Sequence, residues 1–215
     1  MKIYEPLVVK QLKAFYGNAL YDVGSYSSVK EHLAALARLM QQGIAQQQAA
    51  VYPQITNYHP EFLGVSLTQI EAKSWSLADC QHTIANEYGF ASWEMVSQKP
   101  YNEHFEQAVN QLLAGKLKVL LQMLEKHPKL LKETSAYGHK ATLLHYCGSN
   151  GVELWRQQVP ENLPEIVAFL IASGADKEAK MRVYDGAYTT LQLLTTSAHP
   201  VKAGVHKAVE KLLKT

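Results

Sequence analysis

Cysteine and histidine are the residues of this 215-residue chain whose types could support covalent or acid–base chemistry, and His145 and Cys147 stand two positions apart. A cysteine nucleophile needs a histidine that faces it as a general base. Residues two positions apart on a helix do not face each other, so this pair is a poor catalytic dyad. Cys147 and Cys80 are instead predicted to be small buried hydrophobes, and their separation fits neither a disulfide framework nor a zinc site.

Metal and cofactor chemistry is disfavoured by the spacing of the nine histidines. A zinc site needs three or four ligands, and no two histidines have the i, i+4 spacing of a zincin helix. The sequence also lacks a glycine-rich phosphate loop, a nucleophile elbow and a deaminase signature. The carboxylate pairs Glu103/Glu106 and Asp176/Glu178 are expected on solvated faces. We therefore expect a protein that is not an enzyme, with no catalytic residue, no metal and no cofactor.

The composition is that of a folded chain without a strong charge bias, because 47% of the residues are hydrophobic, 19% are charged and the net charge is +2. This excludes a largely disordered or low-complexity protein and gives no general attraction to nucleic acid or to an anionic membrane. No apolar run approaches the roughly 18 residues of a membrane span, and the amino terminus does not resemble a signal peptide. We expect a soluble, cytoplasmic protein with no nucleic-acid or membrane partner.

Apolar residues recur with helical spacing along much of the chain, which predicts an all-α fold. In the first half, the helical pattern over 29–42 starts after Ser28, a good N-cap, and stops before Gly43. A second helix is predicted after Ser76 and Asp79, which have the spacing of a capping box.

A break between two regions is predicted at Pro100, because the residue before a proline is pushed out of helical geometry. The predicted regions are a helical N-terminal region, 1–100, and a second region, 101–215. Residues 76–98 roughly follow the spacing of a DNA-binding helix-turn-helix, but the segment is acidic and offers few side chains that read base edges. DNA binding is therefore disfavoured, and Trp93 is expected in the core.

Two segments of the second region share the pattern of a known repeat. The offsets of the motif T-P-L-H-x-A-A-x-x-G are matched by Thr142, Leu144, His145 and Gly151. The later segment 165–176, EIVAFLIASGAD, matches the pattern E-I-V-x-L-L-L-x-x-G-A-D, and the first motif restarts at Thr190. On these residues the stretch from about 103 to 215 resembles the ankyrin-repeat family, whose period is about 33 residues.

The resemblance implies a short, irregular ankyrin-repeat stack of about three helix pairs, in which each pair buries its apolar face against its neighbours. The spacing between successive motifs is longer than one period, and most of the excess is an insertion at 152–164. In the family, the histidine of the motif hydrogen-bonds between neighbouring turns, which implies a structural role for His145. The N-terminal region is similar to that of a group of bacterial ankyrin proteins through Asp79, Ile84, Ala85, Glu87, Tyr88, Gly89, Phe90, Ser92 and Trp93.

Ankyrin proteins usually grip partners with their turn tips and first helices, which implies a protein–protein interaction module. The tips are expected at 133–140 and 180–188, and they are rich in the Tyr and Arg that dominate protein interfaces. The predicted binding residues on the tips and the insertion are Tyr137, His139, Lys140, Trp155, Arg156, Arg182, Tyr184 and Tyr188. The insertion has a second interpretation, a lid packed on the stack or on the N-terminal helices. The sequence leaves the identity of the protein partner and the oligomeric state open.

The alternative function is a small-molecule-binding or enzymatic protein. Its pocket would lie between the N-terminal helices and the stack and would be lined by His139, Trp155, Arg156, Tyr188 and His199. A closed cavity lined by these polar groups would favour this alternative over an open aromatic surface. A third possibility, a nucleic-acid binder, requires a basic stripe that the charge balance does not favour.

Overall fold

The computed structural model describes residues 2–215 and is mostly helical, with 59% helix and 5% strand, which confirms the predicted all-α class at this level. The chain forms two compact units. The N-terminal unit contains Leu7–Tyr101 and Ala136–Gly138, and the C-terminal unit contains the residues up to Pro6, Asn102–Ser135 and His139–Thr215. The chain therefore passes from the N-terminal unit to the C-terminal unit after Tyr101, beside Pro100. Residues 2–6 belong to the C-terminal unit and residues 136–138 belong to the N-terminal unit, which is the reverse of the sequence prediction.

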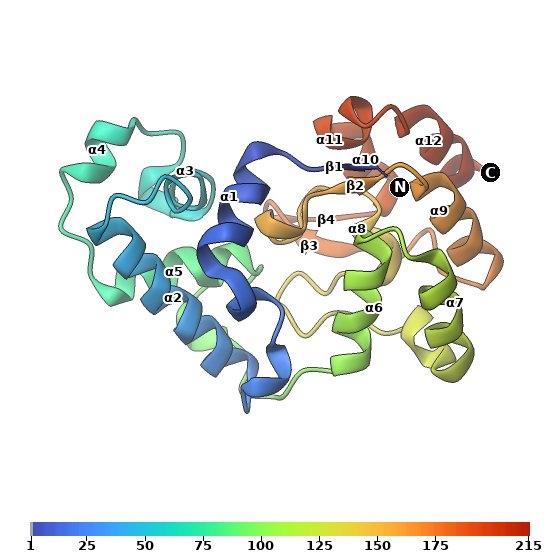
Figure 1. Ribbon diagram of the computed structural model, residues 1–215, viewed down its shortest axis with the longest axis horizontal. Helices are drawn as coiled ribbons and strands as arrows, with labels where there is room; N and C mark the ends of the chain where they lie inside the picture. Colours follow the sequence, from blue (N-terminus) through green and yellow to red (C-terminus); the bar gives the residue numbers. More distant parts are fainter. Residues whose placement is uncertain (1) are drawn as a thin grey trace. The chain divides into compact units, whose positions relative to one another are not determined.

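The N-terminal unit contains helices α1 (Leu7–Tyr16), α2 (Val29–Ala45), α3 (Tyr52–Tyr58), α4 (Leu67–Glu71) and α5 (Leu77–Glu87). Helix α5 packs against both α2 and α3 (Figure 1). Within the described chain, the second helix of the helix-turn-helix pattern over 76–98 is represented only by a 3-10 turn at Trp93–Met95. Trp93 is half-buried there, so its expected place in the core is wrong.

Local hydrogen bonds explain where the N-terminal helices begin. The Ser28 hydroxyl accepts from the Glu31 backbone N–H, and the predicted capping box between Ser76 and Asp79 forms in full. The predicted stop at Gly43 is wrong, because α2 continues past it to Ala45. Glycine is required there by packing, since a Cβ at this position would lie 2.6 Å from the Phe15 ring.

The C-terminal unit contains helices α6 (Glu103–Leu113), α7 (Leu117–Lys126), α8 (Leu143–Tyr146), α9 (Leu163–Ala172), α10 (Thr190–Thr196), α11 (Ala198–Lys202) and α12 (His206–Lys214). Helices α6, α8 and α10 pack in sequence, α7 packs on α6, and α12 packs on both α9 and α10 (Figure 1). Helix α9 runs into a turn at Gly174, which has a φ of +94°. One continuous hydrophobic core joins these helices.

Two short strand pairs complete the C-terminal unit. Strand β1 (Ile3–Tyr4) pairs antiparallel with β2 (Val159–Pro160), and β3 (Met181–Val183) forms a hairpin with β4 (Gly186–Tyr188). The sequence did not predict these strands, because two or three residues are too few to show an alternating pattern. Between Lys2 and Thr215 no helix is long and apolar enough to cross a bilayer.

Candidate functional site

The insertion 152–164 is anchored on the first helix pair of the C-terminal unit rather than standing out from it. The Gln158 side-chain amide donates to the Leu113 carbonyl at 3.0 Å, and the Asn162 amide donates to the Gly115 carbonyl at 2.9 Å. The last carbonyls of a helix have no partner within it, so the Gln158 amide satisfies one at the end of α6, and the Asn162 amide binds the turn that follows α6. Of the two interpretations left open by the sequence, the structure supports a segment that packs on the helix pairs.

Arg156 is the centre of a buried ionic cluster in this insertion, and its side chain is 1% exposed. Its Nη2 lies 2.7 Å from Glu106 Oε2, and its Nη1 lies 3.7 Å from Glu153 Oε1. The guanidinium also lies over two rings, 4.6 Å from the centroid of Trp155 and 5.5 Å from that of Tyr146. A buried arginine of this kind is held by a carboxylate on each side and by aromatic faces.

Glu153 joins His139 and Tyr146 to the cluster. The His139 Nδ1 accepts from the Ala141 backbone N–H at 3.1 Å, so the ring proton is assigned to Nε2, which lies 3.2 Å from Glu153 Oε1. The Tyr146 hydroxyl donates to the same oxygen at 3.3 Å. One carboxylate oxygen therefore accepts from an imidazole and a phenol and faces a guanidinium.

The two carboxyl groups of the cluster differ in their pKa values. Burial raises the pKa of Glu106, and the nearby Arg156 offsets this only in part. Burial would also raise the pKa of Glu153, but the charge of Arg156 and the hydrogen bond from His139 outweigh burial and lower it. Divergent carboxyl pKa values are typical of acid–base sites. Here both groups are at most 2% exposed, so a substrate has no access, and we interpret the cluster as structural.

Glu106 corrects one sequence interpretation, because it was expected on a solvated face. Its burial follows from its position on α6, where it faces the insertion and meets Arg156 from 50 residues further along the chain. An arginine placed beside a tryptophan within an insertion was the available sequence signal. Arg156 was expected on the surface instead.

Four of the eight predicted binding residues are buried, which corrects their assignment as surface anchors. Tyr137 and His139 are 0% exposed, Trp155 is 3% exposed and Arg156 is 1% exposed. Tyr137 belongs to the N-terminal unit, where its ring packs edge-to-face on Tyr88 with centroids 4.7 Å apart. The other three belong to the ionic cluster. The physical reason is that burying large aromatic rings, or a guanidinium paired with a carboxylate, is more favourable here than leaving them in contact with water.

The other four predicted residues remain accessible at two neighbouring turns. Lys140, Arg182 and Tyr184 are exposed, and Tyr188 is half-buried. The Arg182 backbone N–H donates to the His139 carbonyl at 2.8 Å, which places the β3–β4 hairpin beside the turn that carries Lys140. We call these four residues the tip surface.

The backbone of the tip surface adopts a conformation that ordinary side chains rarely take. Lys140, Tyr184 and Asp185 have φ values of 55°, 52° and 57°. Two successive left-handed residues at a two-residue hairpin loop are the pattern that normally selects Asn-Gly. The Tyr184 hydroxyl donates to Asn150 Oδ1 at 2.8 Å, which helps to hold its ring at the tip. Strain of this kind costs of order 1 kcal/mol per residue and is concentrated at functional positions.

His145 has the structural role implied by the resemblance. Its Nδ1 accepts from the Thr142 backbone N–H at 3.1 Å, and its Nε2 lies 3.0 Å from the Ala179 carbonyl in the next turn. Burial lowers the pKa of His145 to about 4, so the ring is neutral near pH 7. Both buried cysteines are free, as expected of small core residues, and burial raises the pKa of Cys80 to about 12.

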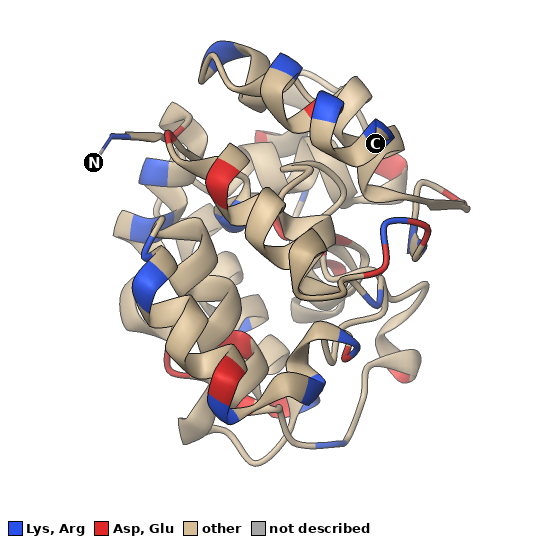
Figure 2. Ribbon diagram, turned by 90° about the vertical axis from the view of Figure 1, so that its right-hand side faces the viewer, with Lys and Arg blue, Asp and Glu red and all other residues tan. Residues whose placement is uncertain are grey.

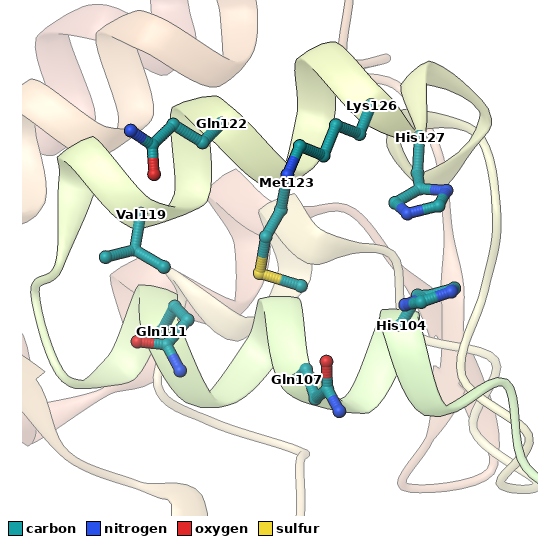
Figure 3. Close-up of a pocket in the computed structure, with 8 residues that line it drawn as sticks. All are labelled: His104, Gln107, Gln111, Val119, Gln122, Met123, Lys126 and His127. Atoms are coloured by element: carbon teal, nitrogen blue, oxygen red, sulfur yellow. The ribbon is translucent and has the colours of Figure 1, made fainter.

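A groove of about 330 Å³ lies between α6 and α7 (Figure 3) and was not predicted. His104 and His127 stack across one end of it, with ring centroids 4.1 Å apart. Its lining residues are His104, Gln107, Gln111, Val119, Gln122, Met123, Lys126 and His127. The sequence signal was the polar i, i+3, i+7 row on α6. None of the residues assigned to the alternative ligand pocket lines this groove.

A metal site, or a similarity to a known protein, would also indicate a specific chemistry. Over residues 2–215 the structure has no cluster of three or more His, Cys, Asp or Glu side chains placed to hold a metal ion. Basic and acidic positions are interspersed along the helices in the view of Figure 2. No protein-family model, curated protein or solved structure matches this chain.

Proposed function

We propose that this chain is a non-enzymatic module that binds another protein through the tip surface of an ankyrin-type stack. The fold part of the proposal is supported by the consecutive packing of α6, α8 and α10 and by the hydrogen bond from His145 to the following turn. The short α8 and the insertion make the stack irregular. The insertion braces the first helix pair and is assigned no direct contact with the partner.

The observation that carries the proposal is the exposure of Tyr184 at a strained hairpin loop. Its side chain is 61% exposed although the residue occupies a left-handed conformation that glycine or asparagine would adopt at lower cost. Arg182 lies two residues before it on β3, which is hydrogen-bonded to the turn that carries Lys140. Rigid tyrosines with adjacent arginines supply much of the binding energy at protein interfaces.

A photo-crosslinking amino acid at position 184 tests the proposal directly. The matched control is the same amino acid at Val201, which is 59% exposed in the same unit but lies on α11. In extracts of cells that make the protein, we expect a discrete crosslinked species from position 184 and none from position 201. Adding Arg182→Ala should weaken the species at position 184. Equal crosslinking at both positions, or no effect of Arg182→Ala, would remove the tip surface as the binding site.

A further inference from the structure

A cation in the N-terminal unit lies over two aromatic rings beside a carboxylate. The Lys73 Nζ lies 5.7 Å from the centroid of the Phe62 ring and 5.4 Å from that of the Trp75 ring. It lies 3.1 Å from Asp79 Oδ1, with the Lys73 and Asp79 side chains 26% and 23% exposed. Two ring faces and a carboxylate are the groups that bind ammonium ions in proteins.

These groups are fixed by contacts that do not involve Lys73. The indole N–H of Trp75 donates to the Ile70 carbonyl at 2.8 Å, and the Trp75 and Phe62 rings pack with centroids 5.1 Å apart. Asp79 Oδ2 accepts from the Ser76 backbone N–H at 2.8 Å within the capping box, which leaves Oδ1 directed at the cation. The site is therefore organised before any cation enters it.

His59 forms the buried wall of the same site. It is 2% exposed, and its ring packs on Phe62 and Trp75 with centroids 5.1 Å and 5.4 Å away. Its Nδ1 accepts from the Glu61 backbone N–H, so its hydrogen is assigned to Nε2, which lies 4.0 Å from Asp79 Oδ1 and makes no hydrogen bond to any described residue. Burial lowers the pKa of His59, so the ring near pH 7 adds no positive charge that would repel a cation.

We propose that Phe62, Trp75 and Asp79, backed by His59, form a binding site for methylated ammonium groups, and that Lys73 occupies this site from within the same chain. A primary ammonium has three N–H donors, and among residues 2–215 Asp79 is the carboxylate within ion-pair distance of it. A methylated ammonium has fewer donors to satisfy and presents more apolar surface to the rings. Lysine is a flexible and strongly hydrated cation, so Lys73 acts as a displaceable occupant.

Tetramethylammonium chloride is the probe that tests the proposal on the full chain. The measurement is the NMR shift of the Trp75 indole N–H during titration, with sodium chloride at equal ionic strength as the reference. We expect Lys73→Ala to bind tetramethylammonium about fivefold more tightly than the unmodified chain, since removing the occupant removes a competing interaction of about 1 kcal/mol. Adding Phe62→Ala, which keeps the Trp75 reporter, should abolish the saturable shift, and adding Phe62→Tyr should retain part of it.

Lys30 supplies a matched control, because its Nζ lies 5.5 Å from the centroid of the Trp93 ring alone. Lys30→Ala exposes one ring without a second ring, so we expect no saturable shift of the Trp93 indole. The proposal is overturned if Lys73→Ala shows no saturable shift at Trp75. It is also overturned if sodium chloride produces the same shift, or if binding survives Phe62→Ala.

Discussion

Arg156 in the C-terminal unit and Lys73 in the N-terminal unit make the same kind of contact with different consequences. Each cation lies over two aromatic rings and beside a carboxylate. Arg156 is 1% exposed, whereas the Lys73 side chain is 26% exposed. Burial is the difference that decides whether such a group is part of the core or can be exchanged with solvent or a ligand.

The chemistry of the two cations matches their surroundings. A guanidinium stays charged, is weakly hydrated and has five donors in a fixed plane, so it can satisfy several buried acceptors at once. Arg156 donates to Glu106 and Asn110 and lies near Glu153. An ammonium on a flexible stem is strongly hydrated, so little free energy is lost when the partly exposed Lys73 exchanges its contacts for water.

Of the substitutions that test this difference, Arg156→Ala is expected to have the largest effect on stability. The substitution leaves two buried carboxyl groups without their cation, so we expect the free energy of unfolding to fall by about 3–5 kcal/mol. Denaturant unfolding monitored by circular dichroism measures the change. The exposed Arg182→Ala is the matched control and should stay within about 0.5 kcal/mol of the unmodified protein.

Neutralising the whole cluster separates charge burial from packing. Because the cost of Arg156→Ala comes from uncompensated buried charge, combining Arg156→Met with Glu106→Gln and Glu153→Gln should recover most of the lost stability. If the combined variant is as unstable as Arg156→Ala, then shape rather than charge holds the insertion in place.

An intermediate effect is expected at His145, a buried histidine whose two nitrogens both make contacts. His145→Ala leaves the Thr142 N–H and the Ala179 carbonyl without their partner and should cost about 2 kcal/mol at pH 7. The folded pKa of about 4 lies below the ordinary value of 6.5, so the unfolded chain binds a proton first as the pH falls. Stability supplied by His145 is therefore present above pH 6.5 and is lost as the pH falls toward 4.

Unfolding of the unmodified chain and His145→Ala at several pH values checks this sign. The difference between the two free energies of unfolding should shrink between pH 7 and pH 4.5, because groups common to both proteins cancel. A difference that stays constant, or grows on acidification, would contradict the neutral assignment of the His145 ring.

The smallest expected effect on stability is that of Lys73→Ala. Its ion pair with Asp79 and its ring contacts are partly solvated, so their loss should change the free energy of unfolding by less than about 1 kcal/mol. Thermal and denaturant unfolding at low and moderate salt measure it. A loss as large as that of Arg156→Ala would mean that Lys73 is a structural cation, and the two regions would no longer differ.

Features fixed by neighbouring residues were predicted well from the sequence. The N-caps at Ser28 and Ser76 are as predicted, and the segment 165–176 is a helix that runs into a turn at Gly174. Gly43 shows the limit of such rules, because a glycine required by close packing has the same sequence signature as a helix stop. Half of the predicted binding residues failed for a similar reason, since residue type does not tell an exposed anchor from a buried one.

What the sequence alone determined is the helical character of the chain and the starts of α2 and α5, while the role of His145 was implied by a resemblance to a repeat motif. These depend on hydrogen bonds within a few residues or on a repeated motif, so they are readable along the chain. Tertiary structure alone decided that Arg156 meets Glu106 across 50 positions and that Phe62, Trp75 and Asp79 surround the Lys73 ammonium. The reason is physical: burial and the pairing of charges are set by which segments pack together, and that is a property of the whole fold.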